Sequence, residues 1–490
     1  MTSRHPAGTV AAVDLGATSG RVMLGHVAPN ELRITSVARF ANGPLQLNEN
    51  GRPALHWNIV ELYRNVVAGL ATAVAAAPDI RSVGVDSWAV DYALMRGGRL
   101  TQLPYHYRDA RCLPASDQAH SRLAATGFTA ADLYAANGLQ FLPFNSLYQL
   151  EADGVSGSLE TADTLLLIPD LLNYWLSGAV VAERTNASTT GLLGVHSRTW
   201  DDDLITRLGL PAQLLPPLID AGEPIGTLLP SVASEIQAPG EITVTAVGSH
   251  DTASAVVAVP SDRDDCAYIS CGTWALVGVE LNSPVVSDSA RLANFTNEGG
   301  VDGRVRFLHN VMGLWLLSES VRTWEREGLP IDLTELLAQA AAVRGQVAVF
   351  DADDPCFLSP GDMPSRIATY CRERDLPVPR TPAEFTRSIL ESLADAFARG
   401  IAQAEDLSGH PISVIHLMGG GSQNRLLCQL TATRSGLPVL AGPVEATAIG
   451  NVLVQARTAG MVTGSLESLR SLVARTFEPI RYEPARSMAQ

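Results

Sequence analysis

The segment from Asp14 to Arg21 is the first whose side chains could do chemistry, and that chemistry would be phosphate binding. A turn of small residues lets backbone amides approach phosphate oxygens closely, and the hydroxyl groups of Thr18 and Ser19 would add donors. Asp14 follows an apolar run, and its carboxylate could hold Mg²⁺ through water, because hard cations prefer oxygen ligands. Arg21 would supply positive charge. The alternative is a plain β-hairpin turn that ends in a surface arginine.

A second candidate is the run Ser249-His250-Asp251-Thr252, between a predicted strand and a predicted helix. A carboxylate at such a turn can lie in a cleft and accept a proton from a hydroxyl group. Asp251 is therefore a candidate general base. The same run also has an ordinary structural explanation, because Asp and Thr are common N-caps and a single histidine usually has a structural role.

Two glycine-containing turns occur in the C-terminal half. Cys271-Gly272-Thr273 places a glycine beside a hydroxyl group, as in the first segment, although Gly-Thr turns are common. Gly419-Gly420-Gly421 lies between a predicted strand and a predicted helix, and three consecutive glycines are costly in chain entropy. A flat ligand such as adenine could contact the backbone there. We therefore interpret this run as a ligand contact; the alternative is a turn that enters a helix.

Three polar or aromatic residues are candidates for binding a sugar. Trp88 and Asp91 follow a strand end, where the ring could cover the C–H face of a sugar and the carboxylate could accept its hydroxyl groups. The alternative is a core tryptophan and a surface aspartate. Asn310 is a similar polar candidate, and its alternative is an N-cap.

The chain contains no lysine, so all 35 cationic side chains are arginines. This excludes a P-loop of the GxxxxGK[ST] type, a protein-kinase lysine and a pyridoxal Schiff base. If the protein binds ATP, then arginine, a metal ion or backbone amides must balance the phosphate charge. The formal net charge is −16, without a basic run, and this disfavours nucleic acid and anionic membranes as partners.

The six cysteines indicate reduced thiols rather than a disulfide scaffold. No CxxC pair or zinc spacing occurs, although Cys356 and Cys371 could meet in space. Met1–Val10 has no apolar signal core, and the longest apolar stretch, Val66–Pro78, is too short to span a bilayer. We therefore expect a cytoplasmic protein.

The elements that would position these residues repeat along the chain. We expect a strand, a tight turn and a second strand at Val10–Asp14 and Val22–Val27, and again at Ala267–Ser270 and Trp274–Leu281. At about 100–200 residues per domain, a chain of this length has two or three domains. The duplicated hairpins favour two α/β domains, residues 1–245 and 246–490.

The other elements that we expect are strands and helices between these hairpins and after them. The strands are Leu32–Phe40, Ile80–Val85, Ile242–Val247 and Val414–Met418; the helices are Ile59–Ala77, Ala253–Val259, one from near Gln423 and one through about Thr458.

Taken in order, these segments resemble the FGGY family of carbohydrate kinases over nearly the whole chain. No single string is specific, but the combination is. The matching strings are VDLGATSGRVML (13–24), GVDSWAVDYAL (84–94), GLQFLPFNSLYQL (138–150), SHDTASAV (249–256), SCGTWALVG (270–278), NEGG (297–300), NVMGLWLL (310–317), MGGGSQN (418–424) and AGPVEATAIGN (441–451).

The resemblance implies an α/β fold of two RNase H-like (actin/hexokinase-like) domains, with ATP and sugar in the cleft between them. The members that the chain resembles most phosphorylate the 1-hydroxyl group of L-rhamnulose in L-rhamnose catabolism. The resemblance also implies a role for each matching residue. Ala17, Thr18, Ser19, Gly20 and Arg21 would hold ATP phosphates, with Asp14 near the metal; Asp251 would accept the proton; His250, Asp251, Thr252 and Asn310 would contact the sugar; Thr273 and Gly420 would contact the nucleotide.

Two positions depart from the family pattern. Ala89 stands where close relatives have glycine, and the added methyl group narrows the sugar site or fills spare room. Ser318 stands where a longer polar residue can occur, at a candidate nucleotide contact. The exact sugar is therefore left open.

Two rival functions remain. One is a kinase for another ketose, such as L-fuculose or L-xylulose, and the other is a non-catalytic sensor of ATP and sugar on the same fold. A sensor should lack a carboxylate at the position of Asp251. We expect a ketose and ATP as partners, with Mg²⁺ as cofactor, no nucleic acid, no membrane, and a monomer or homodimer.

Overall fold

The computed structural model describes residues 7–261 and 263–485. Residues 1–6, part of the stretch in which we found no signal core, lie outside the described residues. The chain divides into two compact units. Unit 1 runs up to Ala258 and adds Glu280–Phe307 and Ala446–Thr476, and unit 2 comprises the remaining segments, Val259–Val279, Leu308–Glu445 and the residues from Phe477 onward. This grouping differs from the boundary at residue 245, because two later segments pack with the N-terminal half.

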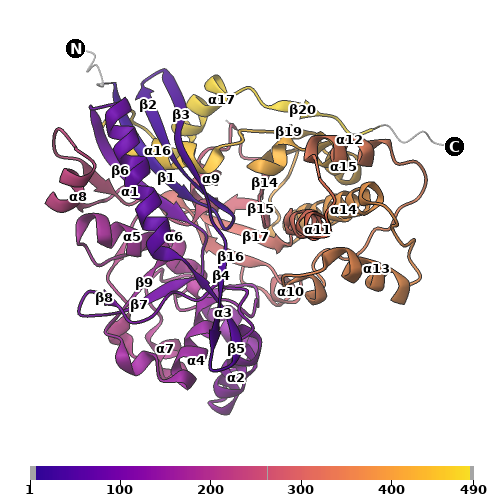
Figure 1. Ribbon diagram of the computed structural model, residues 1–490, viewed down its shortest axis with the longest axis horizontal. Coiled ribbons are helices and arrows are strands. Elements are labelled where there is room, and N and C mark those ends of the chain that lie inside the picture. The colour runs from indigo at the N-terminus through magenta and orange to yellow at the C-terminus, as the bar shows by residue number, and fades with distance from the viewer. Residues whose placement is uncertain (1–6, 262, 486–490) are drawn as a thin grey trace. The chain divides into compact units, whose positions relative to one another are not determined.

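Unit 1 is built on a six-stranded sheet in the order β12-β13-β6-β1-β2-β3. β1 is buried along its whole length, pairs in parallel with β6 and forms an antiparallel hairpin with β2. The strands predicted at the N-terminus and near residues 80 and 242 are confirmed. The sheet comprises β1 (Gly8–Leu15), β2 (Ser19–Ala28), β3 (Glu31–Ala41), β6 (Ile80–Ser87), β12 (Pro224–Thr227) and β13 (Thr243–Thr245) (Figure 1).

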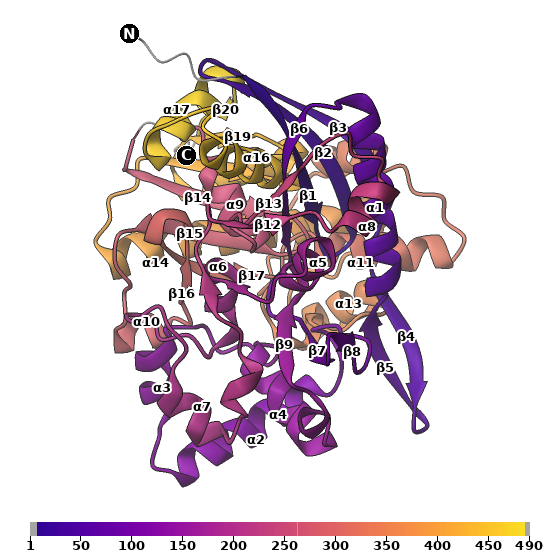
Figure 2. The same ribbon diagram turned by 90° about the vertical axis from the view of Figure 1, so that its left-hand side faces the viewer.

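Two helices cover opposite faces of this sheet, α1 (Ile59–Ala76) and α16 (Ala446–Thr458) (Figure 2). A Cβ atom on Gly69 of α1 would lie 2.5 Å from Val22, and one on Gly25 would lie 2.3 Å from Val452 of α16. Residues three apart on a strand point to opposite faces. The helices therefore approach β2 from either side, and glycine permits each close contact.

Helix α1 also corrects our expectation about the longest apolar stretch. It has 18 residues with a mean hydropathy of 1.3, and by length and composition it could cross a membrane, the one such helix among the residues that the structure describes. Leu62, Val66 and Leu70 lie on its buried face. Such a composition is also that of a core helix, the role that α1 has in unit 1.

The remaining elements of unit 1 lie mostly between β6 and α9. The strands are β4 (Pro44–Glu49), β5 (Arg52–Trp57), β7 (Tyr92–Arg96), β8 (Arg99–Leu100), β9 (Thr164–Leu167), β10 (Ala182–Glu183), β11 (Leu218–Ile219) and β16 (Thr296–Gly299). The helices are α2 (Cys112–Ala125), α3 (Ala130–Asn137), α4 (Ser146–Ser156), α5 (Ile168–Ser177), α6 (Arg184–Ala187), α7 (Asp202–Leu208), α8 (Pro230–Glu235), α9 (Asp251–Val257), α10 (Asp288–Leu292) and α17 (Leu466–Thr476). Short 3₁₀ turns are Leu159–Thr161, Ser188–Thr190, Ala212–Leu214 and Val301–Gly303.

Unit 2 carries most of a second, seven-stranded sheet, in which the strand order is β16-β17-β15-β14-β18-β19-β20. The predicted second hairpin is confirmed, since β14 and β15 pair antiparallel and β14 pairs in parallel with β18. The strands are β14 (Cys266–Cys271), β15 (Ala275–Leu281), β17 (Val305–Val311), β18 (Val414–Met418), β19 (Val439–Ala441) and β20 (Ile480–Tyr482). The helices are α11 (Trp315–Arg326), α12 (Leu333–Ala342), α13 (Met363–Glu373), α14 (Pro382–Ser408) and α15 (Arg425–Ser435), with 3₁₀ turns at Pro355–Phe357 and Gly420–Gln423.

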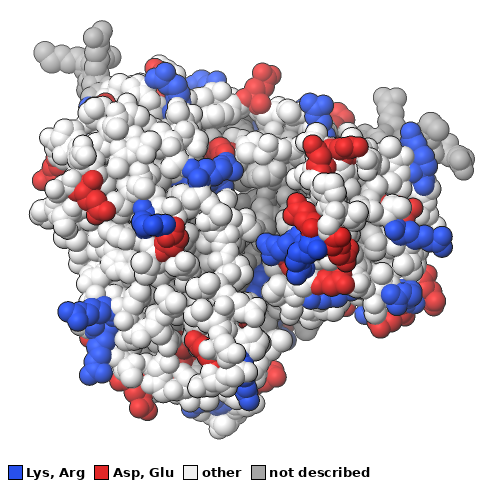
Figure 3. All heavy atoms as spheres, viewed as in Figure 1, with Lys and Arg blue, Asp and Glu red and all other residues white. Residues whose placement is uncertain are grey.

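The distribution of charged side chains and the state of the cysteines agree with what we expected from the sequence. On the face in Figure 3, basic and acidic side chains lie interspersed, without a large patch of one sign. All six cysteines are free thiols, and four of them are buried. Cys356 and Cys371, which we considered as possible neighbours, are not bonded to each other.

Candidate functional site

The first hairpin places Asp14 beside Arg21. The two residues are partners across β1 and β2, and Nε of Arg21 lies 3.4 Å from Oδ2 of Asp14. The backbone N–H of Gly16 closes the turn by donating to the carbonyl oxygen of Ser19 at 2.9 Å. Thr18 at the tip is exposed. The turn therefore consists of small, accessible residues, and Arg21 follows it on β2.

Gly20 has a packing reason for being glycine. A Cβ atom there would lie 2.2 Å from the ring of Phe40 and 2.8 Å from Leu15. A larger residue would displace the ring, because a packed core cannot absorb an extra methyl group without a shift. Its small size follows from the packing of β2 on β3, and any contact with phosphate would be made through its backbone.

Asp86 is a carboxylate of this region that the sequence reading did not nominate. It is the register partner of Asp14 on the neighbouring strand β6 and has no solvent exposure. Burial raises the pKa of Asp86 well above its ordinary value, and the nearby carboxylates of Asp14 and Asp251 raise it further. The Nδ2 group of Asn451 donates to its Oδ2 at 2.6 Å. The sequence feature that could have identified Asp86 is an aspartate near the end of a buried strand, which is also the position of Asp14.

Asp251 is the first residue of α9, directly after a turn that is attached to the end of β6. The N–H of Ser87 donates to the carbonyl oxygen of Ser249 at 2.9 Å, and Ser87 forms a β-bridge with His250. The N-cap of α9 is His250, and no side chain caps the helix. The N-cap explanation for Asp251 therefore does not apply. Its side chain is 30% exposed, which leaves the carboxylate accessible.

Two neighbours approach the same oxygen of Asp251. The buried Thr252 donates from its hydroxyl group to Oδ1 at 3.0 Å. Nε2 of His250 lies 3.4 Å from Oδ1. His250 and Thr252, which we expected to act together with Asp251, thus both contact its carboxylate.

The turn before Asp251 is held by hydrogen bonds to Glu183, another residue that was not predicted from the sequence. Glu183 is buried, and its Oε2 accepts from the N–H of Ser249 at 3.0 Å and from its hydroxyl group at 2.8 Å. It also accepts from the N–H and the hydroxyl group of Thr185, whose Oγ1 in turn accepts from the N–H of His250. Burial raises the pKa of Glu183. A glutamate far away in sequence therefore fixes the backbone that carries the candidate base.

Trp88 and Asp91 lie in a buried aromatic cluster. The rings of Trp57 and Trp88 lie 3.9 Å apart between centroids, and both indole N–H groups donate to Oδ2 of Asp91, at 2.6 and 3.1 Å. The N–H of Tyr107 also donates to Oδ2, and Gln149 donates to Oδ1. Protein donors thus occupy both oxygens of Asp91. The alternative of a surface aspartate is wrong, and a sugar hydroxyl would have to displace one of these donors.

The residue after Ala89 has a strained backbone. Val90 has a φ of 66°, in the left-handed region that β-branched residues rarely adopt. Its carbonyl oxygen is held by the hydroxyl group of Ser146 at 2.5 Å and by Gln149 at 3.4 Å. Strain of this kind persists only where the surroundings enforce it, and it is common at functional sites. Ala89 itself is half-buried.

In unit 2 the turn after β14 holds the start of α11. The carbonyl oxygens of Gly272 and Thr273 accept from the N–H groups of Leu314 and Trp315, both at 3.0 Å. Ser318 is exposed in the first turn of α11. Thr273 and Ser318 therefore share one local region of unit 2.

The three glycines after β18 have different roles. A Cβ atom on Gly419 would lie 2.9 Å from the carbonyl oxygen of Cys271, and one on Gly421 would lie 2.4 Å from the sulfur of Cys271. A Cβ atom on Gly420 would meet no atom within 4 Å. Two of the glycines are thus explained by the close approach of β14, while Gly420 lies open and exposed, as a ligand contact requires.

Asn310 lies within β17 and is half-buried. The N-cap explanation for it is therefore wrong, because α11 begins only at Trp315. Of the predicted site residues, unit 1 contains Asp14, Ala17, Thr18, Ser19, Gly20, Arg21, Trp88, Ala89, Asp91, His250, Asp251 and Thr252, and unit 2 contains Thr273, Asn310, Ser318 and Gly420.

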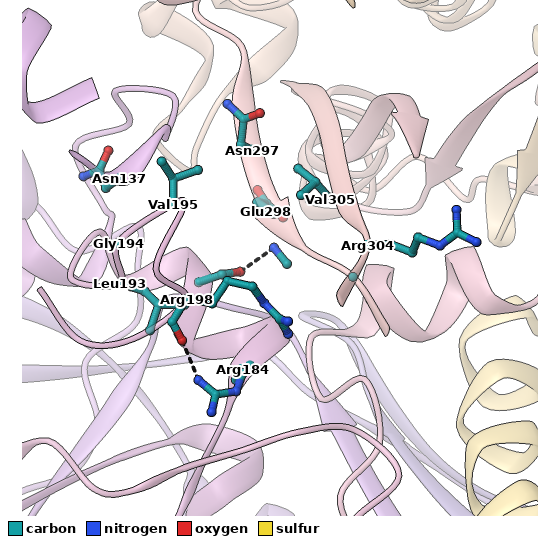
Figure 4. A pocket seen from close by; sticks show the side chains of 13 residues that line it. Asn137, Arg184, Leu193, Gly194, Val195, Arg198, Asn297, Glu298, Arg304 and Val305 are labelled. Atoms are coloured by element: carbon teal, nitrogen blue, oxygen red, sulfur yellow. Dashed lines mark hydrogen bonds between the residues drawn. The ribbon is translucent and has the colours of Figure 1, made fainter. Parts of the chain in front are cut away.

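A pocket in unit 1 is lined by Arg184, Arg198 and Arg304 (Figure 4). Arg184 and Arg198 both pair with Oδ1 of Asp220, at 2.9 and 3.1 Å. Arg304 pairs with Glu467. The guanidinium groups thus have acceptors within the protein, and we assign no ligand to this pocket.

Asp14 and Asp86 fit a Mg²⁺ ion that is held mainly by water and phosphate. In residues 7–261 and 263–485, no group of three or more His, Cys, Asp or Glu side chains could hold a metal by itself. Mg²⁺ usually binds one or two carboxylates together with substrate phosphates. Oδ1 of Asp86 is buried without a hydrogen-bond partner in the described part of the chain, so an acceptor is available beside Asp14.

Comparison with known proteins identifies the family. Residues 9–258 match the N-terminal domain, and residues 267–459 the C-terminal domain, of the FGGY family of carbohydrate kinases. The chain belongs to this family. As an FGGY protein it is a carbohydrate kinase, for which ATP is the expected phosphoryl donor.

FGGY relatives align with the chain over almost its full length. A rhamnulokinase from Bacteroides thetaiotaomicron is 39% identical over 476 residues, which cover 96% of this chain and 95% of the relative. A rhamnulokinase from Pectobacterium atrosepticum is 42% identical over 484 residues, with coverage of 97% and 93%. The resemblance that the motifs indicated is therefore confirmed.

Solved structures confirm the two-domain α/β fold of FGGY kinases. The xylulose kinase from Rhodospirillum rubrum has a TM-score of 0.73 at 19% identity and covers 98% of this chain and 95% of its own. The Plasmodium falciparum glycerol kinase with ADP has a TM-score of 0.74 at 15% identity, with coverage of 98% and 94%.

Proposed function

We propose that this FGGY kinase phosphorylates the 1-hydroxyl group of L-rhamnulose with ATP, giving L-rhamnulose 1-phosphate and ADP in L-rhamnose degradation. The observation that carries the choice of sugar is the 36–42% identity to rhamnulokinases over 95% or more of the chain. Asp251, accessible and unused as a helix cap, supports catalysis over a sensor role. The proposal includes a cytoplasmic location and a monomer or homodimer.

Asp251 acts as the general base. Its carboxylate accepts the proton of the sugar hydroxyl as that oxygen bonds to the γ-phosphorus and the bond from this phosphorus to the β,γ-bridging oxygen breaks. Thr252 and His250 approach Oδ1, so we assign proton acceptance to Oδ2. Glu183 holds the preceding turn. The base is therefore already positioned before the reaction, and no entropy is lost in ordering it in the transition state.

The nucleotide contacts are the small hairpin turns and the open glycine. We assign the phosphates to Ala17–Arg21 and further nucleotide contacts to Thr273, Ser318 and Gly420. In a lysine-free chain, Arg21 and backbone amides supply the positive potential. Asp14 and Asp86 would hold Mg²⁺, which neutralises phosphate charge when bound.

The sugar contacts that we propose are His250, Thr252, Asn310 and the segment after β6. In that segment we propose Trp88 and Ala89 as the sugar contacts, and Asp91 holds the indole of Trp88 through a 3.1 Å hydrogen bond. The strained Val90 fixes the direction of this segment.

A coupled assay of ADP release across a panel of ketoses tests the proposal. We expect L-rhamnulose to give the highest kcat/KM, with L-fuculose and L-xylulose at least about tenfold lower, because contacts to individual hydroxyl groups discriminate strongly. A higher value for either rival sugar would overturn the choice of substrate. No sugar-dependent ADP release with any ketose would favour the sensor.

A further inference from the structure

Arg306 lies at the start of β17, entirely without solvent exposure, and contacts the imidazole of His250. Its Nη2 is 2.9 Å from Nδ1 of His250, and its Nη1 is 3.1 Å from Oε2 of Glu298. Its Nε donates to the carbonyl oxygen of Gly299 at 2.9 Å. Two hydrogen bonds and one ion pair therefore hold the guanidinium group. Figure 4 shows Glu298 on β16, beside the strand that carries Val305, the residue before Arg306.

This contact determines which nitrogen of His250 carries a proton. A guanidinium group in a protein retains all its protons and can only donate. Two N–H groups cannot face each other at 2.9 Å, so Nδ1 must present its lone pair to Arg306. A neutral imidazole with an unprotonated Nδ1 carries its proton on Nε2, and Nε2 is the atom that lies 3.4 Å from Oδ1 of Asp251.

Glu298 offers the competing arrangement, and Arg306 opposes it. Oε2 of Glu298 lies 3.3 Å from Nδ1 of His250, so an imidazole protonated at Nδ1 could donate to it. That arrangement would set an N–H of His250 against the N–H of Arg306. Nη1 of Arg306 also forms an ion pair with the same oxygen of Glu298 at 3.1 Å, and this positive charge balances the carboxylate without a proton from His250.

We propose that Arg306 is a positioning residue that fixes His250 as the neutral tautomer with its proton on Nε2, directed at Asp251. This inference deepens the proposed function, because it gives His250 a role toward the base. A neutral donor orients the carboxylate without placing a full positive charge beside it, and such a charge would favour the ionised form and oppose proton acceptance.

The direct test is the ¹⁵N spectrum of the protein labelled selectively at histidine, without substrate and at neutral pH. The signals of His250 are assigned by their loss in His250→Gln, among the ten histidines. We expect Nδ1 to show the shift of an unprotonated nitrogen and Nε2 that of a protonated one. An Nδ1–H tautomer or an imidazolium overturns the inference, whatever the enzyme phosphorylates.

A matched pair of variants tests the link to turnover. Arg306→Lys keeps the charge but cannot bond Glu298, Gly299 and His250 at once, so we expect an Nδ1–H population at His250. We also expect a fall of about tenfold in kcat, with the KM for ATP unchanged. Arg304→Lys, two residues away and paired with Glu467, should change neither the tautomer nor kcat.

Two outcomes separate the inference from the function on which it rests. An unchanged tautomer in folded Arg306→Lys contradicts the role of Arg306 even where the enzyme is active. Full activity of Asp251→Asn contradicts the assignment of the base but leaves the tautomer of His250 as measured. Where Arg306→Lys fails to fold, the spectrum of the unaltered protein still decides whether His250 is held as proposed.

Discussion

At the scale of single residues, Asp251 is the first residue of α9, but its side chain does not cap the helix. The carboxylate therefore has no structural role as a cap and remains available as a general base. The carboxylate receives Thr252 and His250 on one oxygen. The sequence offered Asp251 as a candidate but could not exclude the cap, because cap geometry depends on which backbone N–H the side chain meets. Glu183 and Arg306, which hold the turn and His250, could not be found from sequence, since their partners are distant along the chain.

Replacement of Asp251 by asparagine removes the proton acceptor while keeping the size of the side chain. We expect kcat to fall on the order of 10²-fold or more, with the KM for the sugar nearly unchanged, because Thr252 and His250 stay in place. Steady-state ADP release measures both constants. Turnover close to that of the unaltered enzyme would contradict the assignment.

The ionisation of the buried Asp91 should affect the stability of the protein. Burial raises its pKa from 3.8 to about 7, although hydrogen bonds from Gln149 and Trp57 favour the charged form. The folded value lies above the unfolded one, so the stabilising contribution is fully present below about pH 4 and is lost as the pH rises through about 7.

The difference in unfolding free energy between the unaltered protein and Asp91→Asn isolates this contribution from other titrating groups such as His106. We expect the difference, unaltered protein minus variant, to decrease between about pH 5 and 8, as proton linkage requires. Urea unfolding at several pH values measures it. A difference that is constant or grows with pH would contradict the raised pKa of Asp91.

At the scale of elements, hairpins and helices could be predicted from period and turn residues, whereas the reasons for individual glycines could not. The pairs β1–β2 and β14–β15 agree with the predicted strands to within a few residues. Gly20 and Gly421 are small because Phe40 and Cys271 pack against them, and such contacts are not local in sequence. Of the three glycines 419–421, only Gly420 has open space around its Cα atom, as we expect for a ligand contact.

The packing of α9 on α16 supports the position of Asp251. A Cβ atom on Gly450 of α16 would lie 1.8 Å from the carbonyl oxygen of Ser254 on α9. Gly450→Ala should lower the unfolding free energy by about 1–3 kcal/mol, as overpacking does, and should lower kcat because α9 must shift. Gly240→Ala, where the new methyl group meets nothing within 4 Å, is the control. Equal stability of the two variants would contradict this account.

At the scale of the whole molecule, the chain returns to unit 1 after completing most of unit 2. Asn451 reaches Asp86 across 365 residues of sequence, and α16 covers a face of the first sheet. A boundary at residue 245 follows from the repeated hairpins, but periodicity cannot show that residues 446–476 pack with the N-terminal half. The two-domain α/β class was predictable, and the return of the chain was not.

Removal of divalent cations tests the assignment of Asp14 and Asp86. Their carboxylates lie at the ends of neighbouring strands, and Mg²⁺ binds such a pair together with phosphates. We expect EDTA to abolish turnover and excess MgCl₂ to restore it. Asp86→Asn should raise the Mg²⁺ concentration that gives half-maximal rate, with Asp79→Asn as control. Full activity in EDTA would contradict a role for the metal.

The reaction product shows whether the γ-phosphoryl group is transferred to one hydroxyl group of one ketose. The purified enzyme is incubated with L-rhamnulose, MgCl₂ and ATP, and the product is examined by ³¹P NMR with proton coupling. We expect one phosphate ester coupled to the two protons of C1, formed in amounts equal to ADP and on the order of 10²-fold more slowly with Asp251→Asn. A phosphate ester on another carbon, or ADP without a sugar phosphate, would contradict the account.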